Sequence, residues 1–271
     1  MPIPTDPHPA SAYIARENGR YQATVLTRGP WNPEHQHAGP PSALAAQAIA
    51  RVAAPLGLTH FARLTSSLIR PIPISELNVL VETAYSGRNA GHFSAQLFAA
   101  GKEVARFTAL VQREAEVSIP SVLPGHPLPA APCPVDASRP AQFPFKNLDV
   151  GYPDLVEIRV AEGAYFAGPC AAWFRLRRPL VGGQAPTPIE RVAVAADSGN
   201  GLSAVLDFKR YLFLNNDLTI NLFRKPEGEW ICIDARTMLG SGGSGLAEAR
   251  IFDVAGLIGR STQSLLIRMR E

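Results

Sequence analysis

The amino-acid sequence predicts an α+β protein built from two copies of one module, in which a buried helix precedes a meander of antiparallel strands. Three observations support this fold class. A helical run that is apolar almost all round precedes several strand-like runs, the same order of elements returns in the second half, and three stretches of the two halves match at one constant offset. The length of 271 residues is sufficient for one large domain or two of ordinary size.

The first module is predicted to contain a helix over residues 43–52, after an irregular start caused by Pro40 and Pro41. Most of its residues are good helix formers, Ser42 can cap its start, and Gly57 helps to end it. Because few of its positions are polar, we expect this helix to be buried. Strand-like runs are predicted at 21–26, 61–70, 77–85, 92–99 and 104–113.

A proline-rich segment separates the two halves. Eight prolines fall between Pro120 and Pro144, which excludes a helix there and disfavours a central strand. We interpret the segment as a linker with polyproline character. The predicted organisation is therefore an N-terminal repeat over residues 1–118, a linker over 119–150 and a C-terminal repeat over 151–271.

The second half repeats the order of elements. Residues 192–196 lead into the segment 197–201, and a helix is predicted over 202–209. Strand-like runs are predicted at 165–178, 211–223, 230–238, 245–252 and 258–267. The glycine-rich segment 240–245 lies between two of these strands, so we interpret it as a hairpin loop and not as a phosphate cradle.

The two halves match at a fixed spacing. Residues 64–70, 95–98 and 104–108 correspond to 218–224, 249–252 and 258–262, all at an offset of 154 residues. Alternating apolar residues alone would not explain the shared Thr, Arg and Gly at these distances, so we interpret the match as an internal duplication. The segment 37–39 also matches 197–199 at an offset of 160, which pairs His37 with Asp197 at the predicted helix starts.

Composition narrows the class of protein. The net charge of +3 and the pI of about 8.9 suit a phosphate-bearing ligand, but no dense Lys/Arg block indicates nucleic acid. Three widely spaced cysteines and the absence of a C-x-x-C pair fit a reducing compartment and argue against a metal site. Residues 1–10 lack a signal-peptide core, and no run approaches 18 apolar residues. We expect a cytoplasmic protein with no membrane span and no cofactor.

An ordered set of motifs resembles a known family. The segment 37–43 (HAGPPSA) is similar to the helix-start motif of the thioesterase-like superfamily, related to acyl-CoA thioesterase II. Further segments resemble motifs of the same family, namely 196–201, 216–219, 228–230 and 262–264. The resemblance covers roughly residues 20–112 and 165–270, and it implies a double-hotdog fold, in which each repeat wraps an antiparallel sheet around a long central helix.

The resemblance also implies a reaction and a set of residues. Proteins of this family hydrolyse acyl-CoA thioesters with a water held by an Asp, a Thr or Ser, and a Gln. By resemblance, Asp197 matches the Asp and Gln263 the Gln. The hydroxyl position falls on Asn215, which is a departure from the family, although an amide can also bind water. Thr219 is the alternative, because it lies four residues further along the predicted strand.

The residue pattern itself is compatible with these roles. Odd positions from Asn215 to Asn221 are polar and even ones mostly apolar, so one strand face could line a wet cleft or be an ordinary solvated face. Asp197 could be a helix N-cap, where its carboxylate would be stabilised as the anion. Backbone N–H groups at the predicted helix starts, at Gly39 or Gly199, are candidates for stabilising an oxyanion.

The predicted site is asymmetric. At the repeat offsets, Gln263 pairs with Ala109, Asn215 with Phe61 and Asp197 with His37, so the first half lacks an equivalent set. We therefore expect one site per chain, carried by the second half, with residues 37–41 forming part of the acyl pocket wall. His37 could contact substrate or be structural. The nearby His35 gives only a weak indication of a metal site.

Several alternatives stay open. Candidates for contacts to coenzyme A phosphates are Arg63, Arg70, Arg88 and Lys102. Each of them could instead be an ordinary surface charge. Instead of a thioesterase, the chain could be a non-catalytic acyl-CoA-binding protein, or an enoyl-CoA hydratase that uses an Asp/His pair including His37. No G-x-S-x-G, P-loop or G-x-G-x-x-G motif favours another enzyme class. We expect a homo-oligomer, a dimer or higher.

Overall fold

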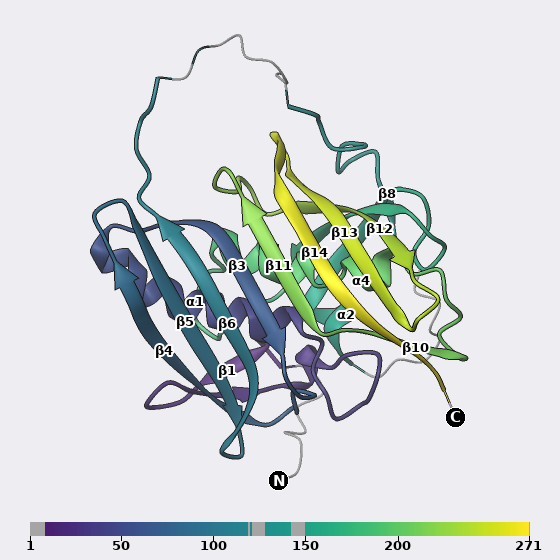
Figure 1. The fold of residues 1–271 in the computed structure, drawn as a ribbon, viewed down its shortest axis with the longest axis horizontal. Helices are drawn as coiled ribbons and strands as arrows, with labels where there is room; N and C mark the ends of the chain where they lie inside the picture. The colour runs from purple at the N-terminus through teal and green to yellow at the C-terminus, as the bar shows by residue number, and fades with distance from the viewer. Residues whose placement is uncertain (1–8, 119, 121–127, 142–149, 271) are drawn as a thin grey trace.

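The computed structural model describes residues 9–118, 120, 128–141 and 150–270, and its main feature is a 14-stranded antiparallel sheet (Figure 1). The strands follow the order β1-β2-β4-β5-β6-β3-β11-β14-β13-β12-β9-β8-β7, with β10 also paired to β14. First-half strands are β1 (Tyr13–Ala15), β2 (Arg20–Ala23), β3 (His60–Leu68), β4 (Glu76–Ser86), β5 (Ala90–Ala99) and β6 (Lys102–Gln112). The remaining strands are β7 (Arg139–Pro140), β8 (Val156–Glu162), β9 (Cys170–Leu176), β10 (Tyr211–Asn215), β11 (Asp217–Leu222), β12 (Ile231–Leu239), β13 (Ser244–Asp253) and β14 (Gly256–Met269).

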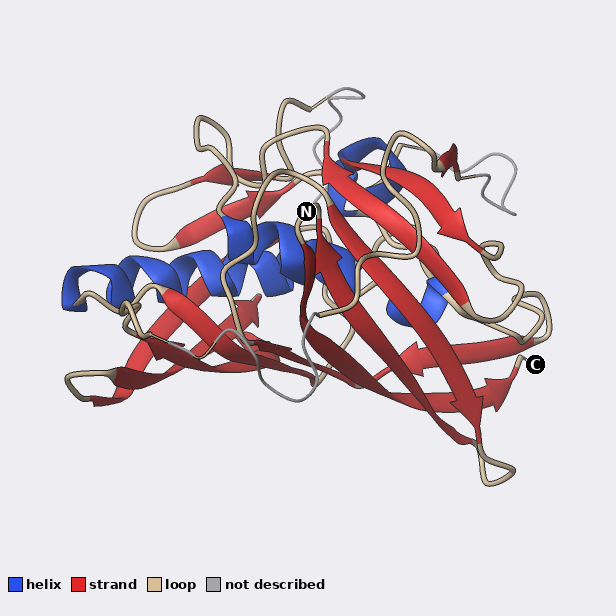
Figure 2. Ribbon diagram, turned by 90° about the horizontal axis from the view of Figure 1, so that it is seen from above, coloured by secondary structure: helices blue, strands red, loops and turns tan. Residues whose placement is uncertain are grey.

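The helices lie against one face of this curved sheet (Figure 2). They are α1 (Gly39–Ala53), α2 (Tyr152–Leu155), α3 (Pro188–Ala196) and α4 (Gly199–Leu202), with short 3₁₀ turns at Val25–Thr27 and Ala54–Leu56. Pro40 and Pro41 fit the first turn of α1, where no intrahelical N–H is needed. No described helix is long and apolar enough to cross a membrane.

Residues that are 154 positions apart in the sequence occupy corresponding positions in the strand pairing of the two halves. Thr65 lies opposite Thr108 where β3 pairs with β6, and Thr219 lies opposite Thr262 where β11 pairs with β14. The two half-sheets join where β3 pairs with β11 and Thr65 lies opposite Thr219, with their Oγ1 atoms 3.3 Å apart. Equivalent positions thus face each other at the centre of the sheet, and one apolar core runs through both halves.

The helices α1 and α3 pack side by side in opposite directions. The start of α1 meets the end of α3, because a Cβ added at Gly39 would lie 2.8 Å from the Val194 carbonyl oxygen. Further along, the Gln47 side-chain amide donates to the buried Glu190 carboxylate at 2.8 Å. The residue after α3 is therefore brought to the residues that precede α1.

The prediction of a helix over residues 202–209 is wrong. The main helix of the second half is α3, of nine residues, and it ends before Asp197 instead of starting after it. Only the four-residue α4 follows, and the chain turns after Leu202. The sequence does contain the signal for α3, since Thr187 and Glu190 form a T-x-x-E pattern with Pro188 at the first helical position. As a result, His37 and Asp197 are not equivalent positions: His37 precedes a helix and Asp197 follows one.

The strand predicted over 211–223 is interrupted by a bulge at Asn216. Asn215 lies opposite Leu265 of β14, whereas Thr219 lies opposite Thr262, so the pairing shifts by one residue between β10 and β11. A one-residue shift exchanges the two faces of a strand. Consequently Asn215 shares the inner face with Leu218 and Ile220, both buried, and the prediction that all odd positions share a face is wrong.

The other strand predictions have mixed outcomes. Most of the predicted runs agree with the observed strands within two residues: 61–70, 77–85, 92–99, 104–113, 230–238, 245–252 and 258–267. The glycine-rich segment forms a hairpin loop at 240–243. The run at 21–26 is strand only to Ala23. The run at 165–178 is strand only from Cys170 to Leu176, and the prediction misses β8.

Part of the proline-rich segment packs against the second half. Arg139 and Pro140 form the edge strand β7, a place where proline is tolerated. The Trp173 indole N–H donates to the Cys133 carbonyl oxygen at 2.9 Å. The predicted linker therefore also packs, at residues 129–138, against the outer face of the sheet around Trp173. Its remaining stretches, 119, 121–127 and 142–149, lie outside the described residues.

Glu190 gives a pH-dependent prediction for the α1–α3 contact. Burial raises the pKa of Glu190, although the Thr187 and Gln47 hydrogen bonds oppose the rise. A raised folded-state pKa stabilises the fold below the unfolded pKa of about 4.3, and this contribution is lost as pH rises through the folded pKa. Urea titrations give the free energies of unfolding of the wild type and of Glu190→Gln. We expect the difference, wild type minus variant, to decrease as the pH rises from 4.5 to 7. A difference that increases with pH would contradict the assignment.

Candidate active site

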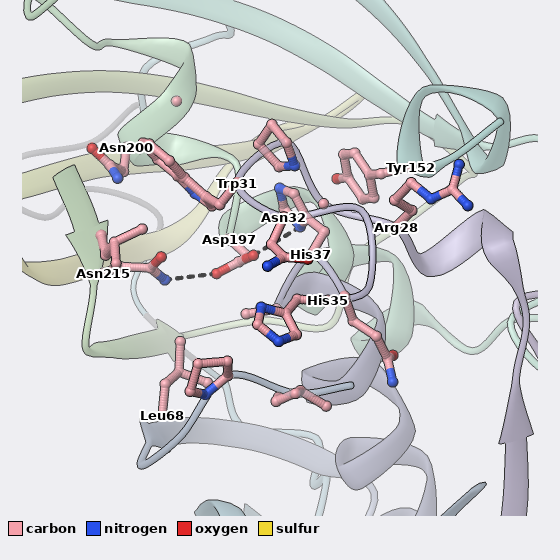
Figure 3. Close-up of a pocket in the computed structure, with 18 of the residues that line it drawn as sticks. Arg28, Trp31, Asn32, His35, His37, Leu68, Tyr152, Asp197, Asn200 and Asn215 are labelled. Atoms are coloured by element: carbon pink, nitrogen blue, oxygen red, sulfur yellow. Dashed lines mark hydrogen bonds and ion pairs between the residues drawn. The ribbon is translucent and has the colours of Figure 1, made fainter. Parts of the chain in front are cut away.

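A cavity of about 330 Å³ lies where the two halves meet, at the start of α1 and the end of α3 (Figure 3). Its lining comes from both halves: residues 28–32, 35–38, 68–72, 151–153, 165–166, 197–198, 200–201 and 214–216. Of the predicted site residues, Asp197, Asn215 and His37 line this cavity. It is mostly apolar, with a few converging polar groups, as is usual for small-molecule sites.

Asp197 is held by a side chain from each half. Its Oδ1 accepts a hydrogen bond from the Asn215 amide at 2.8 Å, and its Oδ2 lies 2.8 Å from His37 Nδ1 (Figure 3). The Gly39 N–H also points at His37 Nδ1, at 3.2 Å, and competes with Asp197 for this ring nitrogen. Because a carboxylate is the stronger partner, we assign the proton to Nδ1, which then donates to Asp197. The Asp197 side chain is 3% exposed, so a buried carboxylate is held by two donors.

The helix packing explains this position of Asp197. The residue is the C-cap of α3 and precedes the four-residue α4, whose N-cap is Ser198. The N-cap interpretation of Asp197 is therefore wrong, and its charge opposes the dipole of α3. The start of the longer helix α1 lies beside it and supplies the opposite, favourable end of a dipole.

Asn215 and Thr219 lie on opposite faces of the sheet. The bulge at Asn216 turns Asn215 toward Asp197. Thr219 is partly exposed on the outer face, with its hydroxyl beside that of Thr65. Thr219 is thus remote from the cavity and cannot replace Asn215 there.

Gln263 contacts the backbone around Asp197 and not its carboxylate. Its Nε2 donates to the Asp197 carbonyl oxygen at 3.1 Å, and its Oε1 accepts from the Asn200 N–H at 2.9 Å. The side chain is buried and does not line the cavity. Both ends of the amide therefore fix the turn between α3 and α4.

Tyr152 supports His37 from the other side and was not predicted. The two rings stack at 3.9 Å with an interplanar angle of 5°. The Tyr152 hydroxyl lies 2.9 Å from both the Val194 carbonyl oxygen, to which it donates, and Ser198 Oγ. Burial raises the pKa of Tyr152 well above its usual value, so the hydroxyl stays protonated. No spacing in the sequence relates Tyr152 to His37.

The two predicted backbone donors differ in their surroundings. Gly39 is the first residue of α1, and the two prolines after it have no N–H, so its N–H, which points at His37 Nδ1, is the one backbone donor of that turn before Ser42. A Cβ at Gly199 would lie 3.1 Å from Gln263 Oε1, which places Gly199 against the sheet. Neither glycine lines the cavity, whereas Ala38 and Ser198 do.

Two arginines line the cavity. Arg70, one of the predicted phosphate contacts, lines it together with Arg28, which was not predicted. The other predicted cations lie elsewhere: Arg63 in β3, Arg88 in the turn before β5, and Lys102 at the start of β6. His35 also lines the cavity. Among the described residues, no group of three His, Cys, Asp or Glu side chains is arranged to hold a metal ion.

Sequence profiles of known families match most of the chain. The acyl-CoA thioesterase N-terminal domain matches residues 27–112, and the acyl-CoA thioesterase C-terminal domain matches residues 130–267. The chain belongs to the acyl-CoA thioesterase family. The suspected family resemblance is thereby confirmed, and each profile covers one half of the sheet.

Solved structures share the fold of this acyl-CoA thioesterase family member. A candidate thioesterase II from Thermobifida fusca YX superposes with a TM-score of 0.73 at 18% identity, covering 99% of both chains. A conserved protein with a hot dog fold from Alicyclobacillus acidocaldarius gives 0.69 at 17%, covering 97% of both. An acyl-CoA thioesterase II from Mycobacterium marinum gives 0.66 at 18%, covering 94% of both. No curated protein matches the sequence.

The Gln263 contacts predict a stability effect. Gln263→Leu leaves the buried Asn200 N–H and Asp197 carbonyl without partners, so we expect the free energy of unfolding to fall by about 1–3 kcal/mol. The measurement is urea denaturation.

Thr262→Val is the matched control for Gln263→Leu. Thr262 is the neighbouring residue of β14 and is exposed on the other face of the sheet, so its replacement should stay within about 0.5 kcal/mol of wild type. Equal effects of the two substitutions would contradict the role given to Gln263.

Proposed function

We propose that this protein hydrolyses acyl-CoA thioesters to the free acid and coenzyme A in the cavity between its two halves. The observation that carries the proposal is the Asp197 carboxylate on the cavity wall, bonded to Asn215 and His37. The match of both thioesterase domains supports the reaction class. A buried carboxylate with two fixed donors is suited to orient water and to accept its proton.

In the proposed reaction, a water molecule lies between the Asp197 carboxylate and the Asn215 side-chain oxygen. Asn215 donates its NH₂ group to Asp197, so its Oδ1 remains to accept from the water. The water oxygen attacks the thioester carbonyl carbon while Asp197 takes one proton. Collapse of the tetrahedral intermediate breaks the C–S bond, and the leaving thiolate takes the proton from Asp197.

The oxyanion of the intermediate needs a hydrogen-bond donor. We assign this role to the Gly39 N–H at the start of α1, whose contact with His37 Nδ1 at 3.2 Å would give way to the oxyanion. The N-terminal end of α1 adds a favourable dipole. Losing one such donor typically lowers the rate about 10²–10³-fold.

The remaining residues have supporting roles in the proposal. Gln263 positions the Asp197 turn through the backbone, instead of holding the water directly. His37 orients the carboxylate and is itself fixed by Tyr152. Arg28 and Arg70 are proposed to contact the phosphates of coenzyme A at the cavity.

The organisation of the chain is part of the proposal. We infer two hotdog repeats from one duplication, over residues 1–118 and 151–271, joined by 119–150. The common strand register at an offset of 154 supports this inference. One water-holding set per chain follows, since the first half contributes Gly39 at the start of α1 and His37 just before it, while the second half contributes the acid and the amide. A cytoplasmic homo-oligomer remains our expectation.

The role of Asp197 predicts the effect of its neutralisation. In Asp197→Asn the water loses its proton acceptor, so kcat for acyl-CoA hydrolysis should fall at least about 10²-fold. Thiol release from a panel of acyl-CoA substrates measures it. Asp234→Asn is the matched control, because Asp234 pairs with Arg250 on the outer sheet face. Unchanged hydrolysis in Asp197→Asn would refute the assigned role.

Asn215 predicts a graded effect. Asn215→Ala removes both the bond to Asp197 and the water acceptor, so kcat should fall about 10-fold to 10²-fold, whereas Asn215→Thr supplies the family's hydroxyl and should retain most of the activity. Steady-state kinetics on one substrate compares the three proteins. If Ala and Thr were equally impaired, a water-holding role for position 215 would be untenable.

The His37–Asp197 pair favours enoyl-CoA hydration as a second candidate function, because hydratases of this fold use an Asp/His pair. The 2.8 Å contact supplies such a pair. Crotonyl-CoA distinguishes the two functions: loss of the enoyl absorbance without thiol release indicates hydration, and thiol release indicates hydrolysis.

A further inference from the structure

Aromatic side chains close the side of the cavity next to Asn215. We refer to Trp31, Tyr165, Phe166, Phe208 and Phe213 as the aromatic wall. Trp31, Tyr165 and Phe166 line the cavity, while Phe208 and Phe213 pack behind them. In Figure 3 the Trp31 ring lies beside Asn200, on the same side of Asp197 as Asn215. The rings come from three loops and β10, and therefore from both halves of the chain.

The wall is held in place by its own contacts. The Trp31 ring stacks on Phe208 at 4.6 Å and meets the edge of Phe213 at 5.0 Å. Phe213 is 2% exposed, so the cluster is anchored in the core. The Arg270 guanidinium lies 4.8 Å from the Phe208 ring and 5.7 Å from the Trp31 ring, covering both.

Phe166 adds a second, independent observation. Its backbone has φ of +61°, in the left-handed region that non-glycine residues rarely adopt. Such conformations persist only where the surroundings impose them, and they concentrate at ligand sites. Here the conformation places the Phe166 ring 5.1 Å from Tyr165 and 6.3 Å from both Phe208 and Phe213.

We propose that the aromatic wall binds the acyl group and makes the protein selective for aryl acyl-CoA thioesters over long straight-chain ones. The inference rests on the proposed function and specifies its substrate class. Flat rings offer offset-stacked and edge contacts to another ring, and Phe208 and Phe213 fill the space behind Trp31 and Phe166, so the wall is two rings deep. The cavity volume of about 330 Å³ is also at the small end of the range for ligand sites.

A substrate panel tests the preference with the full-length protein. Thiol release gives kcat/KM for benzoyl-CoA, phenylacetyl-CoA and dodecanoyl-CoA. We expect the better of the two aryl substrates to exceed dodecanoyl-CoA at least 10-fold. A kcat/KM for dodecanoyl-CoA equal to or above both aryl values overturns the proposal.

Variants of the wall test its role directly. Trp31→Leu and Phe208→Leu should each reduce the aryl to dodecanoyl ratio of kcat/KM at least 10-fold. The ratio is taken within one protein sample, so a smaller folded fraction does not alter it. Phe223→Leu is the control, because Phe223 is 53% exposed and lies outside the cavity; its ratio should equal that of wild type. Unchanged ratios in both wall variants overturn the proposal.

Failure of the proposed function can be distinguished from failure of this inference. If wild type hydrolyses none of the three thioesters, hydrolysis itself is refuted. Calorimetric binding of the same three thioesters then decides the acyl preference: tighter binding of an aryl thioester supports the wall as its binding site, and tighter binding of dodecanoyl-CoA overturns it.

Discussion

The close antiparallel contact between α1 and α3 determines how the site is assembled. A side chain at Gly39 would collide with the Val194 carbonyl oxygen at 2.8 Å, so only glycine allows the two helices to approach this closely. This approach brings the residues before α1 to the residue after α3. His37 and Asp197 come from different halves and reach contact at 2.8 Å for this reason. The buried Gln47–Glu190 hydrogen bond fixes the same pair of helices further along.

The two halves have matching strand registers but unequal sites. Their registers agree at an offset of 154 residues, and they join where Thr65 lies opposite Thr219. If α1 and α3 were equivalent, the two ends of the helix pair would carry equivalent groups. One end holds Asp197, Asn215 and His37 around a cavity, while toward the other end the middle of α1 meets the first turn of α3 through the Gln47–Glu190 hydrogen bond. The shared scaffold thus positions the groups, and the side chains of one end carry the proposed chemistry.

The sequence predicted the strands well and the helices less well, for physical reasons. Period-two alternation defines strands such as β4, β5 and β13 within two residues. The second helix was misplaced because the repeat comparison aligned Asp197 with His37 and passed over the Thr187–Glu190 capping pattern. The bulge at Asn216 could not be predicted, since a one-residue register shift depends on the partner strand β14. The resemblance supplied Asp197 and Asn215, but the His37 contact and the Tyr152 stack depend on how the two halves pack.

Isotopic oxygen tests most directly whether water itself attacks the thioester carbonyl in the proposed reaction. In a single turnover with excess protein in H₂¹⁸O, we expect one ¹⁸O in the released acid and none in the peptide that contains Asp197. If the Asp197 carboxylate attacked the thioester and water opened the resulting anhydride at the Asp197 carbonyl, ¹⁸O would enter Asp197 and the released acid would carry none. Label in that peptide after one turnover would contradict direct attack by water.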